Sequence, residues 1–445
     1  MPHPTEVLFF FDTEDFTSNR SADAILELAR ICTEEGVRGH FALVGLLAFQ
    51  LQAWGRRDVL DALSPHEVGT HTYGHSLHPD ICEQTDFESF DQSYLTAAKS
   101  ECEALGLIRG VTGHRELLFA VPPGDSKSYA AMYLYANLGI PFYCDTVVTD
   151  DKNRDLYYCN LRQIAYTRAV EEIFCADTPP DLDAILDDFA AQERVIVYTH
   201  PNMAYFSQFW DGVNYHGENR HPWGEWEPCK PRDPAQTRAY FNGFRTLIRR
   251  IRADERFRIT DLPALRASEP PRRPVTPGDI PVLYDALRRA LAPVTVPQSL
   301  SVADIFLACV TFLGGSTEYL PAHVYGFLSA PVGISEPVTV TADALRAAAR
   351  YMDVSRFLPE RIPVGDTSLG PADFLYAALD VLSRGADSVT LQPCPQLNSL
   401  AAFPSLERFS LRGTWVHTAA LRDDYLSDRL RLQAWTLRYG AVSCR

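Results

Sequence analysis

Residues 1–268 alternate short apolar runs with longer stretches whose apolar positions recur at helical spacing. Residues 7–11 (VLFFF) predict a buried strand, and residues 22–35, which end at Gly36, predict an amphipathic helix. Because strands and helices keep alternating, the pattern predicts an α/β fold with a parallel sheet, either open or closed into a barrel. In such folds the chemistry lies at the carboxyl ends of the strands. Further strands are predicted at 40–44, 67–69, 111–114, 142–146, 173–176, 195–199 and 257–260, and further helices at 57–63, 87–105, 126–138, 182–191 and 234–251.

A proline-rich stretch marks the end of this alternation. Residues 267–279 (ASEPPRRPVTPGD) contain four prolines, which is typical of a boundary between domains. We therefore predict an N-terminal domain at 1–268, a linker at 269–279, and a smaller, mainly helical domain at 280–445.

Two segments of the predicted C-terminal domain, 299–313 and 368–382, align without a gap. Both begin with Ser-Leu, share Ala-Asp at the same offsets, and continue as an apolar helix. They predict a duplicated helical unit, with coincidence among Ala- and Leu-rich helices as the alternative. Because paired helical units with apolar faces need partners, we expect this domain to serve as a scaffold, in docking or in homo-oligomerisation.

Composition excludes several classes of protein. The formal net charge is -16 and no dense Lys/Arg run exists, which disfavours binding to nucleic acids or to anionic membranes. Ten cysteines occur without a Cys-x-x-Cys pair, which argues against a disulfide scaffold or a cysteine-ligated zinc site. The longest apolar run, 41–49, is too short to cross a bilayer, and residues 1–11 show no basic region and no cleavage-like segment. We expect a cytoplasmic protein without a transmembrane segment.

Three acidic residues, Asp12, Glu14 and Asp15, follow the first predicted strand (FFFDTEDF). Acidic side chains this close repel one another, and a metal ion or a catalytic proton is the usual compensation. The alternative is a helix N-terminus that carries acidic residues without any catalytic role.

Histidines follow two other predicted strands. His71 and His75 (HEVGTHTYGH) are four residues apart, which would place both imidazoles on one side of a helical turn, close enough to bind one ion. His200 ends the strand VIVYTHP, where the alternative is a hydrogen-bonded core histidine. Arg115 (GVTGHRELL) follows a further predicted strand and could orient one of the carboxylates.

In order and rough spacing, these motifs resemble those of the polysaccharide deacetylases, the NodB-homology or carbohydrate esterase family 4 proteins. The resemblance covers residues 7–265. HTYGH fits the family's His-Ser/Thr-x-x-His, VIVYTHP fits its last motif, and FFFDTED is similar to the Asp-x-Glu/Asp variant of divergent members. The resemblance implies a distorted (β/α)7-type barrel.

The resemblance also implies a divalent metal, zinc first, with cobalt, nickel or manganese as alternatives. His71 and His75 match two of the family's metal ligands. Thr13 occupies the place of the usual carboxylate ligand, so Glu14 is our choice, with Asp15 as the alternative.

Four further roles follow from the resemblance. Asp12 matches the catalytic base, His200 the general acid, and Arg115 the arginine that tethers the base. Asp145 lies in a segment that resembles a pocket-lining strand and would orient His200. The family's Arg-x-Pro-Tyr signature is absent after Arg115, so the backbone contact to an oxyanion is left open.

An aromatic segment at 205–226 follows His200. Such a loop can wall an active site, and four of its side chains could stack on a sugar face; the alternative is a self-packed insertion. These side chains are Trp210, Tyr215, Trp223 and Trp226.

The sequence therefore predicts a metal-dependent hydrolase of a C–N bond. The leading hypothesis is N-deacetylation of an N-acetylated sugar in a glycan or glycoconjugate. One alternative is hydrolysis of a small cyclic amide, imide or ureide on the same fold, and another is a non-catalytic carbohydrate-binding protein.

Overall fold

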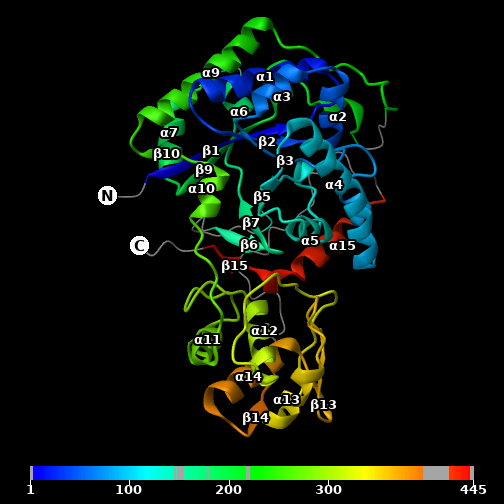
Figure 1. The fold of residues 1–445 in the computed structure, drawn as a ribbon, viewed down its shortest axis with the longest axis vertical. Helices are drawn as coiled ribbons and strands as arrows, with labels where there is room; N and C mark the ends of the chain where they lie inside the picture. The colour runs from blue at the N-terminus through cyan, green and yellow to red at the C-terminus, as the bar shows by residue number, and fades with distance from the viewer. Residues whose placement is uncertain are drawn as a thin grey trace. The chain divides into compact units, whose positions relative to one another are not determined.

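The computed structural model divides the chain into two compact units (Figure 1). Unit 1 comprises Met1–Thr146, Gln163–Ser268 and Ser410–Asp423, and unit 2 comprises Val147–Arg162, Glu269–Phe409 and Asp424–Arg445. One change between units falls at Ser268, whereas residues 147–162 join the second unit from within the first part of the chain. The structure describes residues 4–144, 147, 155–176, 178, 180–216, 221–393 and 420–440.

Unit 1 is built on a parallel sheet with the strand order β5-β4-β3-β2-β1-β9-β8. Strand β1 is central: its second half pairs with β2, its first half with β10, and its other edge with β9, all in parallel. The sheet curls part-way round a barrel, and Figure 1 shows helices around its strands. The strands are β1 (Thr5–Thr13), β2 (Gly39–Leu43), β3 (Glu67–Thr70), β4 (Phe119–Ala120), β5 (Phe142–Cys144), β8 (Arg168–Ala169), β9 (Arg194–Thr199) and β10 (Phe257–Ile259).

The described helices of unit 1 follow the strands in sequence. They are α1 (Asn19–Glu34), α2 (Gly45–Ala53), α3 (Arg57–Leu63), α4 (Phe90–Thr112), α5 (Tyr129–Asn137), α6 (Val170–Phe174), α7 (Leu182–Ala190), α8 (Trp210–Asn214), α9 (Pro234–Ala253) and α10 (Leu262–Ala267). Local sequence explains where several begin. The Ser18 side chain caps α1, and Asp233 with Gln236 forms a capping box ahead of Pro234 at the start of α9.

The core of unit 1 forms where the continuous apolar run of β1 is covered on both faces of the sheet. Phe9, Phe10 and Phe11 are all buried. The Phe11 ring stacks on Phe41 of β2 with a centroid distance of 4.3 Å, and Phe10 stacks on His40 at 4.6 Å. A parallel sheet buried on both faces needs this apolar run, which is why the pattern at 7–11 predicted β1 correctly.

Two predicted strands of unit 1 are wrong. Residues 111–114 include the end of α4 and the loop after it, and residues 173–176 overlap the short helix α6. Both runs are short and apolar, so period alone could not separate a strand from a buried helix turn. For the same reason helix α2 was not predicted. The apolar run 41–49 contains the end of β2 and then the start of α2 at Gly45.

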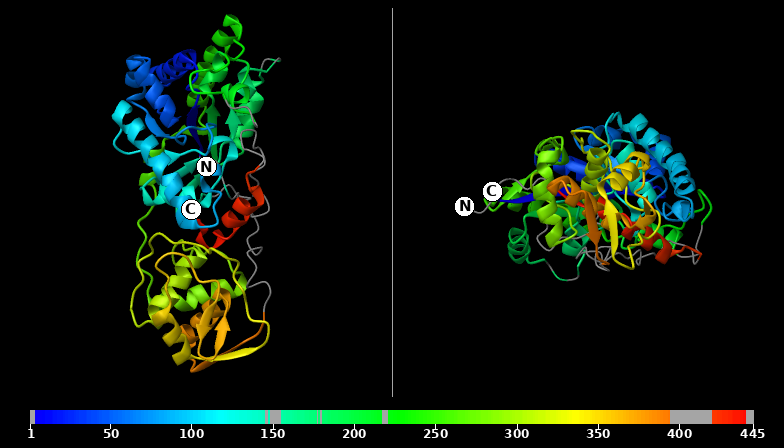
Figure 2. Two further views of the ribbon diagram at one scale, coloured as in Figure 1. Left: turned by 90° about the vertical axis from the view of Figure 1, so that its right-hand side faces the viewer. Right: turned by 90° about the horizontal axis from the view of Figure 1, so that it is seen from below.

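Unit 2 contains helices together with short antiparallel strand pairs (Figure 2). Its helices are α11 (Ile280–Arg289), α12 (Val302–Leu313), α13 (Ala342–Tyr351), α14 (Pro371–Arg384) and α15 (Asp423–Arg431). Its strands are β6 (Leu156–Tyr158), β11 (Val338–Thr341), β12 (Ile362–Val364), β13 (Thr367–Leu369), β14 (Ser388–Leu391) and β15 (Arg438–Tyr439), and β7 (Leu161–Ile164) begins in this unit.

The two aligned segments correspond to α12 and α14, and the correspondence extends beyond these helices. Each is preceded by an antiparallel contact, the Val294–Leu300 bridge before α12 and the β12–β13 pair before α14. A further helix comes before each of these contacts, α11 in the first copy and α13 in the second. An outer antiparallel pair then encloses each copy, Val275 with Tyr319 in the first and β11 with β14 in the second. Unit 2 thus holds two copies of one helix–hairpin–helix arrangement.

Within the residues that the structure describes, we find no helix with the length and apolar character needed to cross a membrane.

Candidate active site

The predicted chemical groups gather at the carboxyl edge of the unit 1 sheet. Glu14 follows β1, His71 follows β3 and His200 follows β9, and these strands lie close together in the sheet order. Parallel neighbours end at the same edge, so residues far apart in sequence meet there.

Glu14, His71 and His75 form a cluster that can bind a metal ion. Glu14 Oε2 lies 2.9 Å from His75 Nε2 and 3.4 Å from His71 Nε2. The side chains are all buried: Glu14 is 4% exposed, His71 2% and His75 5%. One carboxylate and two imidazoles form a donor set suited to zinc, with positions left open for water and substrate.

Hydrogen bonds on the far side of each ring set which nitrogen carries the lone pair. His71 Nδ1 lies 3.0 Å from the Val121 carbonyl oxygen, which can only accept, so Nδ1 donates. His75 Nδ1 lies 2.6 Å from Ser76 Oγ, whose single proton goes to Asp211 Oδ2 at 2.8 Å. Nδ1 of His75 must therefore donate as well. In the neutral rings that a metal site requires, both Nε2 lone pairs then face Glu14.

The two histidines come together through a left-handed loop and not through the helical turn that we predicted. Thr72 and His75 have φ values of 65° and 51°. Backbone bonds hold this loop: Gly45 N donates to Thr72 O at 3.0 Å, and Tyr73 N donates to the buried carboxylate of Glu101 at 3.0 Å. Positive φ is unfavourable in non-glycine residues, so the surrounding bonds must stabilise it.

Asp12 stands beside this cluster and is held by a tyrosine. The Tyr166 hydroxyl donates to Asp12 Oδ1 at 2.7 Å, and the Tyr166 ring stacks on Tyr198 with centroids 4.4 Å apart. The other oxygen, Oδ2, lies 3.7 Å from His200 Nε2. Burial raises the pKa of Asp12 above its usual value, against the opposing effect of the nearby histidines.

His200 is oriented by Glu171, at the start of α6. Glu171 Oε1 lies 2.5 Å from His200 Nδ1, and Thr199 Oγ1 donates to Glu171 Oε2 at 2.7 Å. Burial lowers the pKa of His200, but the carboxylate of Glu171 outweighs it, with help from Glu14 and Asp12, and raises the pKa to about 10. His200 is therefore protonated at neutral pH.

Asp15, the alternative ligand, is used elsewhere. Its Oδ1 accepts from Thr17 N at 2.9 Å and from the Thr17 hydroxyl at 2.6 Å, and its Oδ2 accepts from the Ser21 hydroxyl. Burial raises the pKa of Asp15 to about 6. These bonds fix the start of α1, so the structure brings Glu14 and not Asp15 to the histidines.

The structure does not bring every predicted residue to the site. Arg115 is exposed in the loop after α4, whereas Asp12 is buried and held by Tyr166. The arginine tether is thus not seen, because the predicted strand at 111–114 that would have carried Arg115 to the sheet edge is helix α4 and its end. Asp145 lies outside the described residues.

Of the four aromatic side chains, only Trp223 is largely open to solvent, at 47% exposure. Trp210 is fully buried and its Nε1 donates to Glu14 Oε1 at 3.0 Å, and Tyr215 is buried with its hydroxyl accepting from Trp226 Nε1 at 2.8 Å. Trp210 and Tyr215 therefore support the site from within and are not free to stack on a sugar.

Four site residues escaped the sequence analysis: Tyr166, Glu171, Ser76 and Asp211. Glu171 could have been suspected as an acidic residue two positions before a predicted strand, but that strand is a helix. Tyr166, Ser76 and Asp211 stand in loops or at a helix start with no periodic signal. They act through other residues, so no motif marks them.

A second cluster, His78, Asp80 and Glu83, also brings three potential ligands together. Asp80 Oδ1 accepts from Cys82 N and Glu83 N, and Glu83 Oε2 accepts from Asp80 N at 3.0 Å. His78 Nδ1 lies 2.8 Å from Glu83 Oε2. These reciprocal bonds are those of a capped turn, which accounts for the cluster without an ion.

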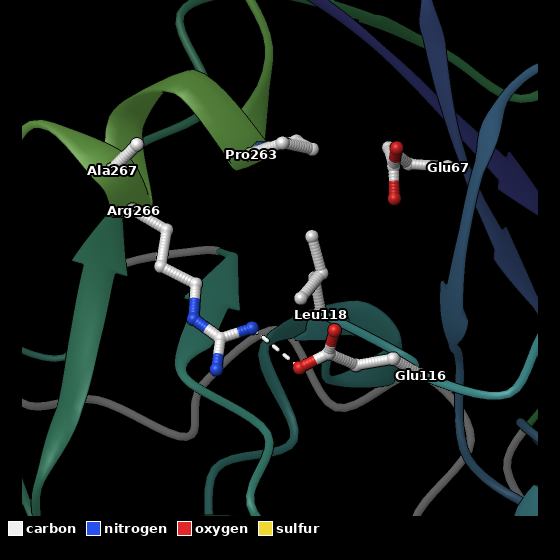
Figure 3. Close-up of a pocket in the computed structure, with 6 residues that line it drawn as sticks. All are labelled: Glu67, Glu116, Leu118, Pro263, Arg266 and Ala267. Atoms are coloured by element: carbon white, nitrogen blue, oxygen red, sulfur yellow. Dashed lines mark hydrogen bonds and ion pairs between the residues drawn. The ribbon is translucent and has the colours of Figure 1, made fainter.

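A pocket of about 450 Å³ lies at the opposite edge of the sheet (Figure 3). Glu67 opens β3, Leu118 precedes β4, and α10 contributes Pro263 and Arg266, whose guanidinium pairs with Glu116. The amino ends of the strands form this pocket, so it is separate from the chemistry at their carboxyl ends.

No protein-family model matches the sequence, and a search of curated proteins finds no similar sequence. Solved structures do show similarity, over about three-fifths of this chain. A Mycobacterium smegmatis protein described as a polysaccharide deacetylase is 14% identical, with 60% of this chain and 91% of that chain covered and a TM-score of 0.39. A family 4 carbohydrate esterase from Streptomyces lividans is 15% identical, with coverages of 58% and 93% and a TM-score of 0.32.

The chain is similar in structure to proteins of carbohydrate esterase family 4. A pseudoenzyme of this family from Bacillus anthracis is 13% identical, with coverages of 59% and 71% and a TM-score of 0.32. The similar structures thus include an inactive protein, and likeness at these identities says nothing about which reaction this chain catalyses.

Proposed function

We propose that this chain is a metal-dependent hydrolase of an amide C–N bond, and that its reaction is N-deacetylation of an N-acetylated sugar. The observation that carries this proposal is that a possible metal-ligand set and a possible acid–base pair lie side by side at one edge of the sheet. Glu14, His71 and His75 form a buried ligand set, and Asp12 and His200 face each other beside it with 3.7 Å between Oδ2 and Nε2.

The ligand set fits a divalent cation, with zinc as our first choice and cobalt, nickel or manganese as alternatives. Two Nε2 lone pairs and a carboxylate oxygen face one another in a buried site, where they would repel without a positive charge between them. When bound, such an ion polarises a carbonyl group and lowers the pKa of water.

Asp12 has the features of a general base. The Tyr166 hydroxyl holds one carboxylate oxygen and leaves the other free to take a proton from the attacking water. Burial raises its pKa, which makes it a stronger base than an exposed aspartate.

His200 has the features of a general acid. An amide leaves as an amine and needs a proton on nitrogen as the C–N bond breaks. With the proton on Nε2 and Nδ1 bonded to Glu171, His200 can donate that proton. Its protonated state at neutral pH agrees with this role.

Exposed aromatic surface beside the site supports a sugar as the substrate class. Trp223 stacks on Phe16, two residues beyond Glu14, with centroids 5.7 Å apart, and its ring also lies 6.5 Å from that of the exposed Phe49. Flat exposed aromatic faces bind the apolar faces of sugar rings well.

The test is hydrolysis by the purified full-length protein loaded with zinc. N-Acetylglucosamine oligomers are assayed for released acetate, beside small cyclic amides, imides and ureides. We expect acetate release that Asp12→Asn abolishes. Turnover of the cyclic compounds alone would favour the alternative reaction. No turnover of either class, with sugar binding unchanged in Asp12→Asn, would make the chain a non-catalytic carbohydrate-binding protein.

A further inference from the structure

Two adjacent side chains at the start of α8 each reach a different member of the candidate ligand set. Trp210 Nε1 donates to Glu14 Oε1 at 3.0 Å. Asp211 Oδ2 accepts from Ser76 Oγ, which in turn bonds His75 Nδ1. One dipeptide therefore bonds Glu14 directly and His75 through Ser76, at atoms other than the Oε2 and Nε2 that face each other.

The hydrogen bond from Trp210 gives the two carboxylate oxygens of Glu14 different partners. Oε2 faces the imidazoles of His71 and His75, and Oε1 accepts the indole N–H. An oxygen that already holds a donor is a poorer ligand for a cation, so Glu14 is directed to bind through Oε2 alone.

The Asp211 bond sets the proton on His75. Because a carboxylate can only accept, Ser76 must donate to Asp211 and accept from His75 Nδ1. In the neutral ring, Nε2 is then unprotonated and points at Glu14. Removing the serine hydroxyl would leave both tautomers of His75 available.

Packing makes this dipeptide rigid. The Trp210 ring is fully buried against Phe16, with centroids 4.7 Å apart, and lies 5.6 Å from the His75 ring. The buried Asn214 side chain ties the end of α8 by donating to Trp210 O at 2.9 Å and accepting from Glu227 N at 2.9 Å. A rigid support is needed if such a bond is to fix the geometry of a ligand.

We propose that Trp210 and Asp211 are positioning residues that make Glu14 a single-oxygen ligand and fix the tautomer of His75. This inference rests on the proposed metal site. It gives the aromatic segment after β9 a role in metal affinity and coordination that is independent of any contact with substrate.

The test measures metal binding by the full-length protein. Apparent Kd values for Zn²⁺ come from competition with a chromophoric chelator, and visible absorption of the Co²⁺-loaded protein reports coordination number. Trp210→Phe keeps an aromatic ring and removes the N–H. Trp226→Phe is the matched control, since Trp226 Nε1 donates to the Tyr215 hydroxyl in the same segment and not to a ligand.

We expect Trp210→Phe to bind Zn²⁺ about tenfold more weakly, in the range found for groups that orient metal ligands. We also expect weaker visible absorption of its Co²⁺ form as Glu14 becomes bidentate, with both readouts unchanged in Trp226→Phe. Ser76→Ala should also weaken Zn²⁺ binding, and it serves as the second variant if Trp210→Phe does not fold. Equal affinities and spectra in wild type, Trp210→Phe and Ser76→Ala would overturn the inference. A wild type that binds no metal would instead overturn the metal site itself.

Discussion

Glu171 Oε1 lies 2.5 Å from His200 Nδ1, and this contact makes His200 a cation at neutral pH. The carboxylate opposes the effect of burial, which alone would favour the neutral ring. In the proposed reaction, the proton for the leaving amine would come from this pair of residues, one at the end of β9 and one at the start of α6.

Replacing Glu171 should move the alkaline limb of the pH–activity profile to lower pH. In the proposed reaction His200 acts in its protonated form, so activity should be lost as the pH rises through its pKa of about 10. Glu171→Gln removes the main charge that raises this pKa, and we expect the limb to move down by at least about one unit. The measurement is kcat/KM against pH. The control is Glu172→Gln, which changes the exposed neighbouring residue; a shift of equal size there would contradict the assignment.

Replacing Tyr166 should impair the base without harming substrate binding. Tyr166→Phe keeps the stacking on Tyr198 but releases Asp12 Oδ1, and we expect kcat to fall about tenfold with little change in KM. Arg115→Gln changes the residue that we first predicted as the tether and should leave kcat near wild type. A larger fall in kcat for Arg115→Gln than for Tyr166→Phe would instead indicate that Arg115 holds Asp12.

Metal content should distinguish Glu14 from Asp15. Glu14→Gln weakens one ligand of the cluster, so the purified protein should lose most of its zinc by elemental analysis and lose its activity. Asp15→Asn alters the bonds to Thr17 and Ser21 at the start of α1, so it should lower thermal stability and retain zinc. Dialysis of the wild type against a chelator should abolish activity, and added Zn²⁺ should restore it. Retention of zinc by Glu14→Gln with its loss from Asp15→Asn would reverse the assignment.

Glu101 should make stability depend on pH. Burial raises its pKa from 4.5 to about 7, so the folded state binds a proton more tightly than the unfolded chain. The free energy of unfolding therefore falls as the pH rises from about 4.5 to about 7, by roughly 3 kcal/mol at most.

Denaturant unfolding at several pH values measures this loss of stability. Glu101→Gln can still accept from Tyr73 N and should flatten the fall between pH 4.5 and 7. Glu103→Gln, at an exposed position on the same helix, should leave it unchanged. An identical fall in Glu101→Gln would assign the pH dependence to another group.

Sequence alone could predict which residues gather at the sheet edge where strands position them directly. Glu14, His71 and His200 each come directly after a strand, and parallel strands must end at a common edge. The residues that support them could not be predicted, because their partners depend on how loops fold back. Arg115 illustrates the limit: its role depended on a strand that proved to be the end of α4.

The fold was predictable where a pattern was long and unpredictable where it was short. Helix α9 carries an apolar pattern at helical spacing over 20 residues, which a strand does not satisfy. Residues 173–176 are four positions with no period to test, and α2 is so evenly apolar that the sequence predicted no helix there. Tertiary packing, not local preference, decides such segments.

The repeated arrangement in unit 2 has a consequence for how this chain associates. Helix α11 packs on α14, and α13 packs on α12. The first helix of each copy therefore packs on the second helix of the other copy. The contact between the rings of Phe306 and Phe374 and the bond from the Tyr284 hydroxyl to Asp380 lie in this mutual interface. This is the geometry of an isologous dimer formed inside one polypeptide. An oligomer of the whole chain would have to use a different surface, because the self-complementary one is already filled by the chain's own second copy.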